Sequence, residues 1–281
     1  MQDSSNFKSF THQSMRSSTY ALCAALLALV FLPAVSRFGQ TPGPGGTAPP
    51  APRLPNGTIN LGITSREKGL WLPRDRTDLG RRSTLAPVET IPFQPWAKAL
   101  YDDRQLHELE PHTRCHPSGV SRQFQTPYGV EFVQIPDLQR VFIIDIGGPH
   151  TFRVVYMDGR PHPRDLVPSY YGHSVGRWDG DTLVVETVGF SERFWIDRTG
   201  LPHTEKLRTV ERFTRTDYNT IKYEVLIEDP DVYTKPWSGG FDLRWSANEE
   251  LFEYVCQDNN TAMEYMTNVG QPVSFTSPII P

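Results

Sequence analysis

The sequence predicts an all-β fold, mainly antiparallel, in which a single meander closes into a barrel. From Tyr128 onward, apolar and polar residues alternate with a period of two. Turn signals such as Asp179-Gly180 separate the alternating runs. No helical pattern lies between these runs, which argues against a parallel sheet with helical crossovers. Closure protects the edge strands of a long meander, and a sandwich of two sheets is the alternative.

The first 36 residues are predicted to be a signal peptide. A mildly basic start with Lys8 and Arg16 precedes an apolar run at residues 20–35. The small residues Ala34 and Ser36 have the spacing that a signal peptidase requires, so we expect cleavage after Ser36 and a periplasmic or secreted protein. The apolar run is short for a membrane span, and we expect none after signal removal. A retained anchor is the alternative.

The next two segments are expected to lie outside the barrel. Residues 37–55 are rich in proline and glycine, a composition typical of an extended linker. Residues 56–127 are irregular and marked by prolines, so we expect an irregular N-terminal wrap. One short helix is predicted there, from Pro95 through Tyr101, because proline suits the first helical turn and alanine and leucine favour helix. Residues 128–281 form the predicted barrel domain.

The predicted strands follow one another at short intervals. Residues 152–156 alternate and end at an Asp-Gly turn. Residues 183–188 form a β-branched run that fits a strand. Residues 221–228 alternate between apolar and charged side chains, which gives one buried and one wet face. The same alternation at residues 241–245 and 252–254 predicts two further strands.

Charge and cysteine content limit the classes of function. The net charge is −4 with both signs interspersed, and no basic cluster points to a nucleic-acid partner. After signal removal only Cys115 and Cys256 remain, and in an exported protein they are expected to form a disulfide. Two buried thiols are the alternative. No cysteine spacing indicates a zinc site, and we expect neither a metal nor a cofactor.

Three residues are candidates for acid–base catalysis. His173 precedes a predicted strand, His203 follows Pro202, and Glu205 lies two residues further. A loop histidine can transfer protons because its pKa is close to neutral pH, and Glu205 can orient His203 by accepting its second ring proton. The same residues also suit metal ligation, or they only cap turns and bond the backbone. The sequence leaves these alternatives open.

A second set of residues is considered for ligand binding: Tyr171, Trp178, Trp195 and Glu211. Aromatic side chains at a barrel mouth can stack on a flat ligand, although they equally serve as core. If the face of the strand that carries Glu211 is interior, an unpaired carboxylate there costs several kcal/mol. The sequence offers three arginines as its partner: Arg177, Arg208 and Arg244. The result is either a buried ion pair or a group that polarises a ligand.

Long motifs run through this region. They are GHSVGRWDGDTLVVETVGF at 172–190, DRTGLPHTE at 197–205, ERF at 211–213, IEDP at 227–230 and YTKPW at 233–237. On these motifs the chain resembles a family of uncharacterised secreted proteins of soil and marine bacteria that share a GRW(D/E)GDTLVV(D/E)T core. The resemblance implies export and carries over no catalytic residue. The strand-turn rhythm also resembles lipocalin-like barrels, which is a likeness of fold alone.

Three hypotheses for the function remain. The first is an exported barrel that binds a small apolar or aromatic molecule in its interior. The second is an enzyme on the same scaffold, an isomerase, cyclase or lyase, that uses His173, His203 and Glu205. The third is a structural envelope protein with a filled barrel. A cavity of several hundred Å³ would separate the first two from the third. The sequence does not decide the oligomeric state.

Overall fold

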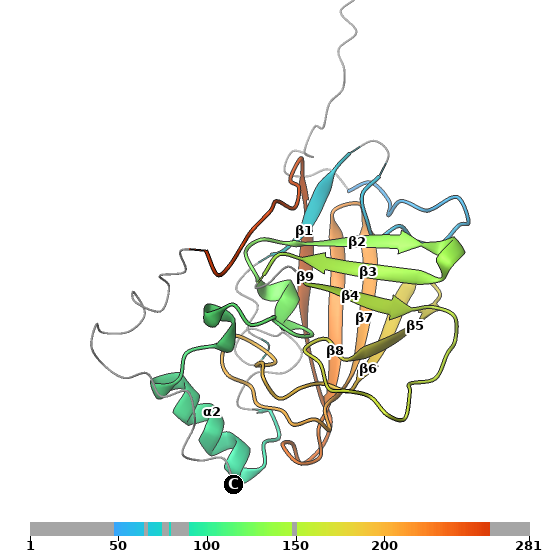
Figure 1. The fold of residues 1–281 in the computed structure, drawn as a ribbon. Coiled ribbons are helices and arrows are strands. Elements are labelled where there is room, and N and C mark those ends of the chain that lie inside the picture. Colours follow the sequence, from blue (N-terminus) through green and yellow to red (C-terminus); the bar gives the residue numbers. More distant parts are fainter. Residues whose placement is uncertain (1–47, 65–66, 75–78, 80–89, 148–150, 259–281) are drawn as a thin grey trace, which may run out of the picture. The chain divides into compact units, whose positions relative to one another are not determined.

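Nine strands close into a barrel in the computed structural model of the chain, within the residues it describes (Figure 1). These are residues 48–258 except 65–66, 75–78, 80–89 and 148–150, and all belong to the compact unit Gly46–Pro281. The strands neighbour one another in chain order, and β9 pairs back onto β1. The predicted all-β barrel is therefore confirmed. The predicted signal peptide and most of the linker lie outside the described residues.

The strands have the following bounds: β1 (Gly69–Pro73), β2 (Val130–Ile135), β3 (Arg140–Asp145), β4 (Thr151–Tyr156), β5 (His173–Asp179), β6 (Thr182–Val188), β7 (Arg208–Asp217), β8 (Thr220–Glu228) and β9 (Trp237–Ala247). Hairpins such as β5–β6 arise where the sequence permits a tight turn. Gly180 of that turn has φ +59°, a conformation that glycine adopts without strain.

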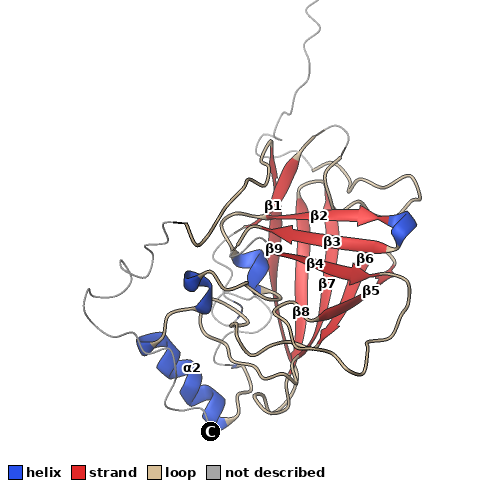
Figure 2. Ribbon diagram, in the orientation of Figure 1, coloured by secondary structure: helices blue, strands red, loops and turns tan. Residues whose placement is uncertain are grey.

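One junction departs from the predicted meander. Strands β4 and β5 run parallel and pair only at Val155–Ser174 and Tyr156–Val175, after a long connection over residues 157–172. A second junction also has few paired residues, because β1 pairs with β2 only at Trp71–Val130. The two junctions separate β2–β4 from the remaining strands. In Figure 2 these three strands cross in front of β7–β9 at a steep angle.

The structure differs from the sequence prediction in two further places. Strand β1 comes from the segment expected to be an irregular wrap, so the barrel begins well before residue 128. Residues 252–254, expected to form a strand, have no regular secondary structure. A closing strand as short as β1 carries too few residues to show a clear period of two.

The predicted helix is present and longer than expected. Helix α2 (Pro95–His107) starts with proline in its first turn and buries Ala97, Leu100 and Tyr101. On its last turns, Arg104 donates a hydrogen bond to the Gly200 carbonyl at 3.1 Å. This hydrogen bond connects helix α2 to the loop between β6 and β7. Within the described ranges, no helix is long and apolar enough to cross a membrane.

The barrel is filled by side chains, many of them aromatic. A short 3-10 helix, η3 (Arg122–Gln125), places Phe124 in the core. The Phe124 ring centroid lies 5.3 Å from that of Phe213 and 4.9 Å from that of Tyr223. Such close packing of large rings leaves the centre of the barrel to protein atoms rather than to a ligand. Two further 3-10 helices among the described residues are η2 (Pro111–Arg114) and η4 (Pro136–Leu138).

A disulfide joins the segment between α2 and β2 to the segment after β9. Cys115, directly after η2, is bonded to Cys256, which follows β9, and their Cα atoms lie 5.6 Å apart. The predicted pairing of these two cysteines is confirmed. The bond closes a loop with a sequence separation of 141 residues, so it connects the segment before β2 to the chain beyond the last strand.

Candidate functional site

A buried ion pair lies inside the barrel. Arg153 of β4 and Glu211 of β7 are 2 % and 0 % exposed, and the Arg153 guanidinium donates to Glu211 Oε2. Arg153 also donates to Ser174 Oγ at 2.8 Å and to Thr187 Oγ1 at 2.7 Å. Tyr223 donates its hydroxyl to Glu211 Oε1 at 3.0 Å. Because both charged groups are enclosed and hydrogen-bonded, this network supports the fold rather than facing a ligand.

The partner of Glu211 is not one of the three arginines that the sequence offered. Arg177 and Arg244 are exposed, and Arg208 pairs with Glu186 and Glu228 outside the barrel. The parallel pairing of β4 with β5 is the reason. It aligns Val155 with Ser174, so that Arg153 lies on the inner face and reaches across the β4–β5 junction. Hydrogen bonds from Arg153 to β5, β6 and β7 thus reinforce a junction with few backbone pairs.

A second buried carboxyl lies at the rim of the barrel. Asp145, the last residue of β3, accepts the Tyr171 hydroxyl at 2.9 Å and the Gly147 backbone N–H at 3.1 Å. Tyr171 also contacts Thr151 Oγ1 at 3.0 Å. Burial raises the pKa of Asp145 to about 7, against the smaller lowering effects of Tyr171, Gly147 and Arg122. Burial also raises the pKa of Tyr171 well above its usual value, so Tyr171 remains a neutral donor.

Asp145 is expected to make stability fall as pH rises. The folded carboxyl holds its proton up to about pH 7, whereas in the unfolded chain it ionises near 3.8. This contribution is complete below the unfolded pKa and is lost as pH rises through the folded pKa. Relative to Asp145→Asn, the wild-type free energy of unfolding should fall by about 1.4 kcal/mol per pH unit between about pH 5 and 6.5. Urea unfolding of both proteins across this range measures the difference.

The comparison with Asp145→Asn is needed because His203 changes stability with pH in the opposite direction. Burial lowers the pKa of His203 to about 4, so stability is lost as pH falls from the ordinary histidine value toward that pKa. In the wild type the slopes from Asp145 and His203 oppose each other over this range. Subtracting the Asp145→Asn data removes the histidine contribution. Parallel pH profiles for the two proteins would show that Asp145 titrates normally.

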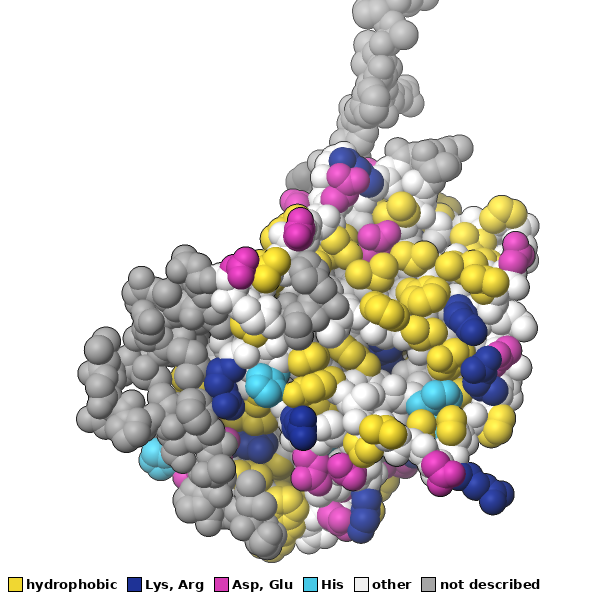
Figure 3. Space-filling model, in the orientation of Figure 1, with side chains coloured by type: hydrophobic (Ala, Val, Ile, Leu, Met, Phe, Trp, Pro, Cys, Tyr) yellow, Lys and Arg dark blue, Asp and Glu magenta, His cyan; other side chains and the backbone are white. Residues whose placement is uncertain are grey.

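A pocket lies outside the barrel, against β3 and β4. Its volume is about 640 Å³. It is lined by Phe142, Ile144, Asp145, Ile146, Thr151, Phe152, Leu251, Phe252 and Glu253. On the face shown in Figure 3, hydrophobic side chains gather over β2–β4, and Phe152 and Phe252 are 60 % and 54 % exposed. Large apolar side chains left in water in this way are typical of a binding surface.

The pocket forms because β4 turns the face that carries Arg153 toward the interior of the barrel. Arg153 and Val155 fill the barrel, so Phe152 and Val154 must point outward. On β3, Phe142 and Ile144 are outward for the same reason, and the Phe142 and Phe152 rings lie 6.2 Å apart. The segment after β9 forms the other wall. Asp145 and Thr151, at the adjoining ends of β3 and β4, also border the pocket, and both side chains bond Tyr171.

The structure places His203 away from this pocket. Its side chain is buried, with Nε2 3.0 Å from the Phe194 carbonyl and Nδ1 3.1 Å from the Thr204 carbonyl. Glu205 is exposed, and its backbone N–H, not its carboxylate, is engaged, bonding Glu192 Oε1 at 3.2 Å. The expected orientation of His203 by Glu205 is thus replaced by two backbone carbonyls. Burial lowers the pKa of His203 to about 4, so its ring is neutral and its single N–H can donate to one of these two carbonyls.

His173 has a partner that the sequence reasoning missed. Its Nδ1 lies 2.9 Å from Nδ1 of His162, and its ring stacks on Tyr156 with centroids 5.1 Å apart. His162 lies in the β4–β5 connection, and its Nε2 is 3.8 Å from Glu186. Burial lowers the pKa of both histidines, with further lowering at His173 from His162. Only the parallel β4–β5 pair brings His162 and His173 together, so spacing alone gives no signal.

The aromatic candidates are mostly structural. Trp195 is buried, and the Arg104 guanidinium lies over its ring, 5.0 Å from the centroid. Trp178 is partly buried against the core. Tyr171 alone reaches the pocket region, through its hydrogen bonds to Asp145 and Thr151. Trp178 and Trp195 do not line the pocket.

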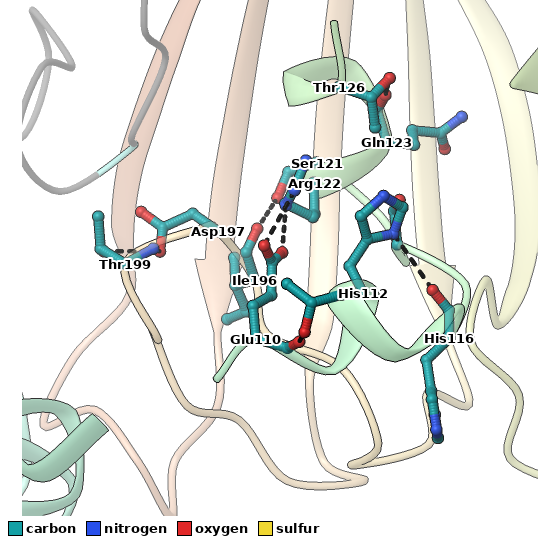
Figure 4. A network of polar contacts seen from close by, with 12 residues as sticks. Glu110, His112, His116, Ser121, Arg122, Gln123, Thr126, Ile196, Asp197 and Thr199 are labelled. Carbon is teal, nitrogen blue, oxygen red and sulfur yellow. Dashed lines mark hydrogen bonds and ion pairs between the residues drawn. The ribbon is translucent and has the colours of Figure 1, made fainter. Parts of the chain in front are cut away.

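A network of polar contacts connects η3 to the segment before it and to the β6–β7 loop (Figure 4). Arg122 of η3 forms two hydrogen bonds with Glu110, and Nη2 to Oε2 measures 3.0 Å. Ser121 donates to the Ile196 carbonyl at 2.7 Å, which ties η3 to the β6–β7 loop. Arg122 is 5 % exposed. Its charge is therefore neutralised by Glu110 rather than presented to solvent.

Neither metal chemistry nor a relative identifies the site. Within the part of the chain that the structure describes, no three His, Cys, Asp or Glu side chains form a group that could hold a metal ion. Comparison of the chain with protein-family models, with curated proteins and with solved structures gives no match. The function is therefore argued from the pocket and its surroundings alone.

Proposed function

We propose that the protein is a binding protein that holds a small apolar or aromatic molecule in the pocket between β3–β4 and residues 251–253. The observation that carries this proposal is the pocket itself. Its volume of about 640 Å³ falls within the range of small-molecule sites. Its walls are mostly aromatic and aliphatic and only a few of its lining residues are polar, as is typical of sites for small apolar molecules.

The proposed site differs from the interior site that the sequence suggested. Inside the barrel, Phe124, Phe213 and Tyr223 pack against one another, and the Arg153–Glu211 pair fills the polar layer. An interior ligand would have to displace these groups and leave two buried charges without partners. The outer pocket needs no such rearrangement. The scaffold then serves as a rigid support for a site on its surface.

The enzyme hypothesis has no specific observation in its favour. His173 and His203 do not line the pocket, and Glu205 is exposed elsewhere. Both ring nitrogens of His203 face backbone carbonyls. The His162–His173 pair lies on the β4–β5 side of the fold and contacts Tyr156 rather than a pocket residue. We therefore assign these histidines no part in binding.

Truncating one pocket wall should weaken binding. Phe152→Ala removes an exposed ring whose loss costs the fold little, but which would cover one side of the ligand. Burying part of an aromatic ring is worth about 1.5 kcal/mol, so the Kd for a neutral aromatic probe should rise about tenfold. Fluorescence titration with aminoanthracene, whose emission increases in apolar surroundings, measures this Kd.

The matched control is Leu106→Ala. Leu106 is 79 % exposed on α2 and does not line the pocket, so its loss should leave the Kd unchanged. Circular dichroism of both variants verifies that the barrel is intact. If wild type fails to bind aromatic probes, or if the two variants bind equally, the proposal is wrong.

A further inference from the structure

The connection between β4 and β5 is attached to the barrel at few points. Its middle part, residues 158–168, contains neither helix nor strand, and within it only His162 and Leu166 are not exposed. Among the described residues, no backbone–backbone hydrogen bond joins this part to the rest of the chain. The side chain of His162 is hydrogen-bonded to His173 of β5. This contact therefore ties residues 158–168 to a strand of the barrel.

The contact between His162 and His173 tolerates only a limited number of protons. The two Nδ1 atoms lie 2.9 Å apart, so one ring donates its N–H and the other accepts through a lone pair. A neutral pair satisfies this requirement, and so does a pair that holds one extra proton. When both rings are charged, every ring nitrogen carries a hydrogen and neither Nδ1 can accept. The doubly protonated pair cannot keep the contact.

His162 is expected to take the first extra proton. Its Nε2 lies 3.8 Å from Glu186 Oε1, and this carboxylate favours the charged ring, although burial lowers the pKa of His162. The charged ring then donates its Nδ1–H to His173. It also opposes a second proton there, because the pKa of His173 is lowered first by burial and next by His162. The pair therefore titrates in two steps, and the second step breaks the contact.

The charges around the pair do not compensate a second proton. Glu186 of β6 is already paired with Arg208 of β7 at 3.0 Å. Asp158 is bonded to Arg160 at 2.9 Å, and Arg160 lies over the Tyr156 ring at 4.1 Å. Two further arginines face the same region, one acting on Glu186 and one lying over Tyr156: Arg177 of β5 and Arg140 of β3. Two charged imidazole rings would thus add positive charge where the nearby carboxylates already have arginine partners.

We propose that residues 158–168 form an acid-sensitive strap, which the His162–His173 contact holds against β5 and which double protonation of the two rings releases. The strap is independent of the proposed ligand, because neither histidine lines the pocket. Since the pKa of each histidine is lowered in the folded protein, the attachment is complete above the ordinary histidine pKa and is lost as pH falls through the lowered values. Strands β4 and β5 share only two paired positions, so release leaves their junction with little support.

Electron paramagnetic resonance of a spin label on the strap tests the proposal. Val167 is 85 % exposed, so a nitroxide attached to Val167→Cys should not disturb the fold. Cys23→Ser removes the remaining thiol, because Cys115 and Cys256 are bonded to each other. As pH falls from about 7.5 to about 4.5, the mobile component of the spectrum should grow. The ratio of released to held strap should rise by up to about tenfold per pH unit.

Two substitutions of His162 separate the contact from its charge. In His162→Asn the amide keeps a hydrogen bond to His173 but takes up no proton, so the label should stay restrained over the whole pH range. In His162→Ala the contact is absent, so the label should be mobile even at neutral pH. The matched control is His107→Asn, because His107 lies at the end of α2 and pairs with Asp103 at 2.7 Å. It should keep the wild-type response.

Three results would each overturn the proposal. The first is a wild-type label whose mobility does not change with pH. The second is an acid response in His162→Asn as large as that of the wild type, which would assign the response to another group. The third is a restrained label in His162→Ala at neutral pH, which would show that the contact does not hold the strap.

Discussion

Removing the Cys115–Cys256 disulfide should destabilise the protein by about 5 kcal/mol. The bond closes a loop with a separation of 141 residues, and a long closed loop strongly restricts the unfolded chain. This loss is comparable to the whole stability of many single domains. In the double variant Cys115→Ala/Cys256→Ala, the thermal unfolding midpoint should therefore drop sharply, as measured by circular dichroism.

A reducing agent provides the control on the same molecule. It should lower the unfolding midpoint of the wild type to that of the double variant and leave the double variant unchanged. This comparison separates the effect of the bond from the effect of the two alanine side chains. A wild-type midpoint that is indifferent to reduction would contradict the predicted role of the disulfide.

The second large effect is expected from breaking the buried ion pair. Arg153→Met leaves Glu211, which is 0 % exposed, with only Tyr223 as a hydrogen-bond donor among the contacts described above. An uncompensated buried charge typically costs 3–5 kcal/mol, so we expect a loss of about 4 kcal/mol in urea unfolding. The double variant Arg153→Met/Glu211→Gln removes both charges. It should be more stable than Arg153→Met alone.

An exposed ion pair on the same strand is the control. Arg212 of β7 pairs with Asp179 at 3.0 Å, and their side chains are 41 % and 59 % exposed. Solvent screens such a pair, so Arg212→Ala should change the free energy of unfolding by less than about 1 kcal/mol. If Arg153→Met were as mild as Arg212→Ala, the interior network would contribute little to the fold.

The hairpins of the barrel could be predicted from the sequence, because their information is local. Asp179-Gly180 fixes the β5–β6 turn, and the alternation at residues 221–228 marks which side chains of β8 are inside. The Cys115–Cys256 bond followed from counting cysteines. The parallel β4–β5 pair did not follow, because two paired positions after a long irregular connection leave no pattern in either strand.

The β4–β5 junction explains why most of the candidate site could not be predicted from the sequence. A period of two says that Phe152 and Arg153 face opposite ways, but not which of them is inside. Only the neighbours of β4 decide this, and they place Arg153 with Ser174 and Glu211. The apolar residues then point outward and form the pocket. The same junction brings His162 to His173, a contact that no spacing in the sequence indicates.

The way the barrel closes also sets the order in which it can be completed during synthesis. Strand β1 has a single paired position with β2 but five with β9, at the other end of the fold. A growing chain therefore carries β1 with almost no partner until Trp237–Ala247 has been made. Chains that stop earlier expose the edges of both β1 and β8, and open strand edges promote association between molecules. Assembly of the barrel thus ends with its last strand, and an incomplete chain is more prone to aggregate than to form a smaller barrel.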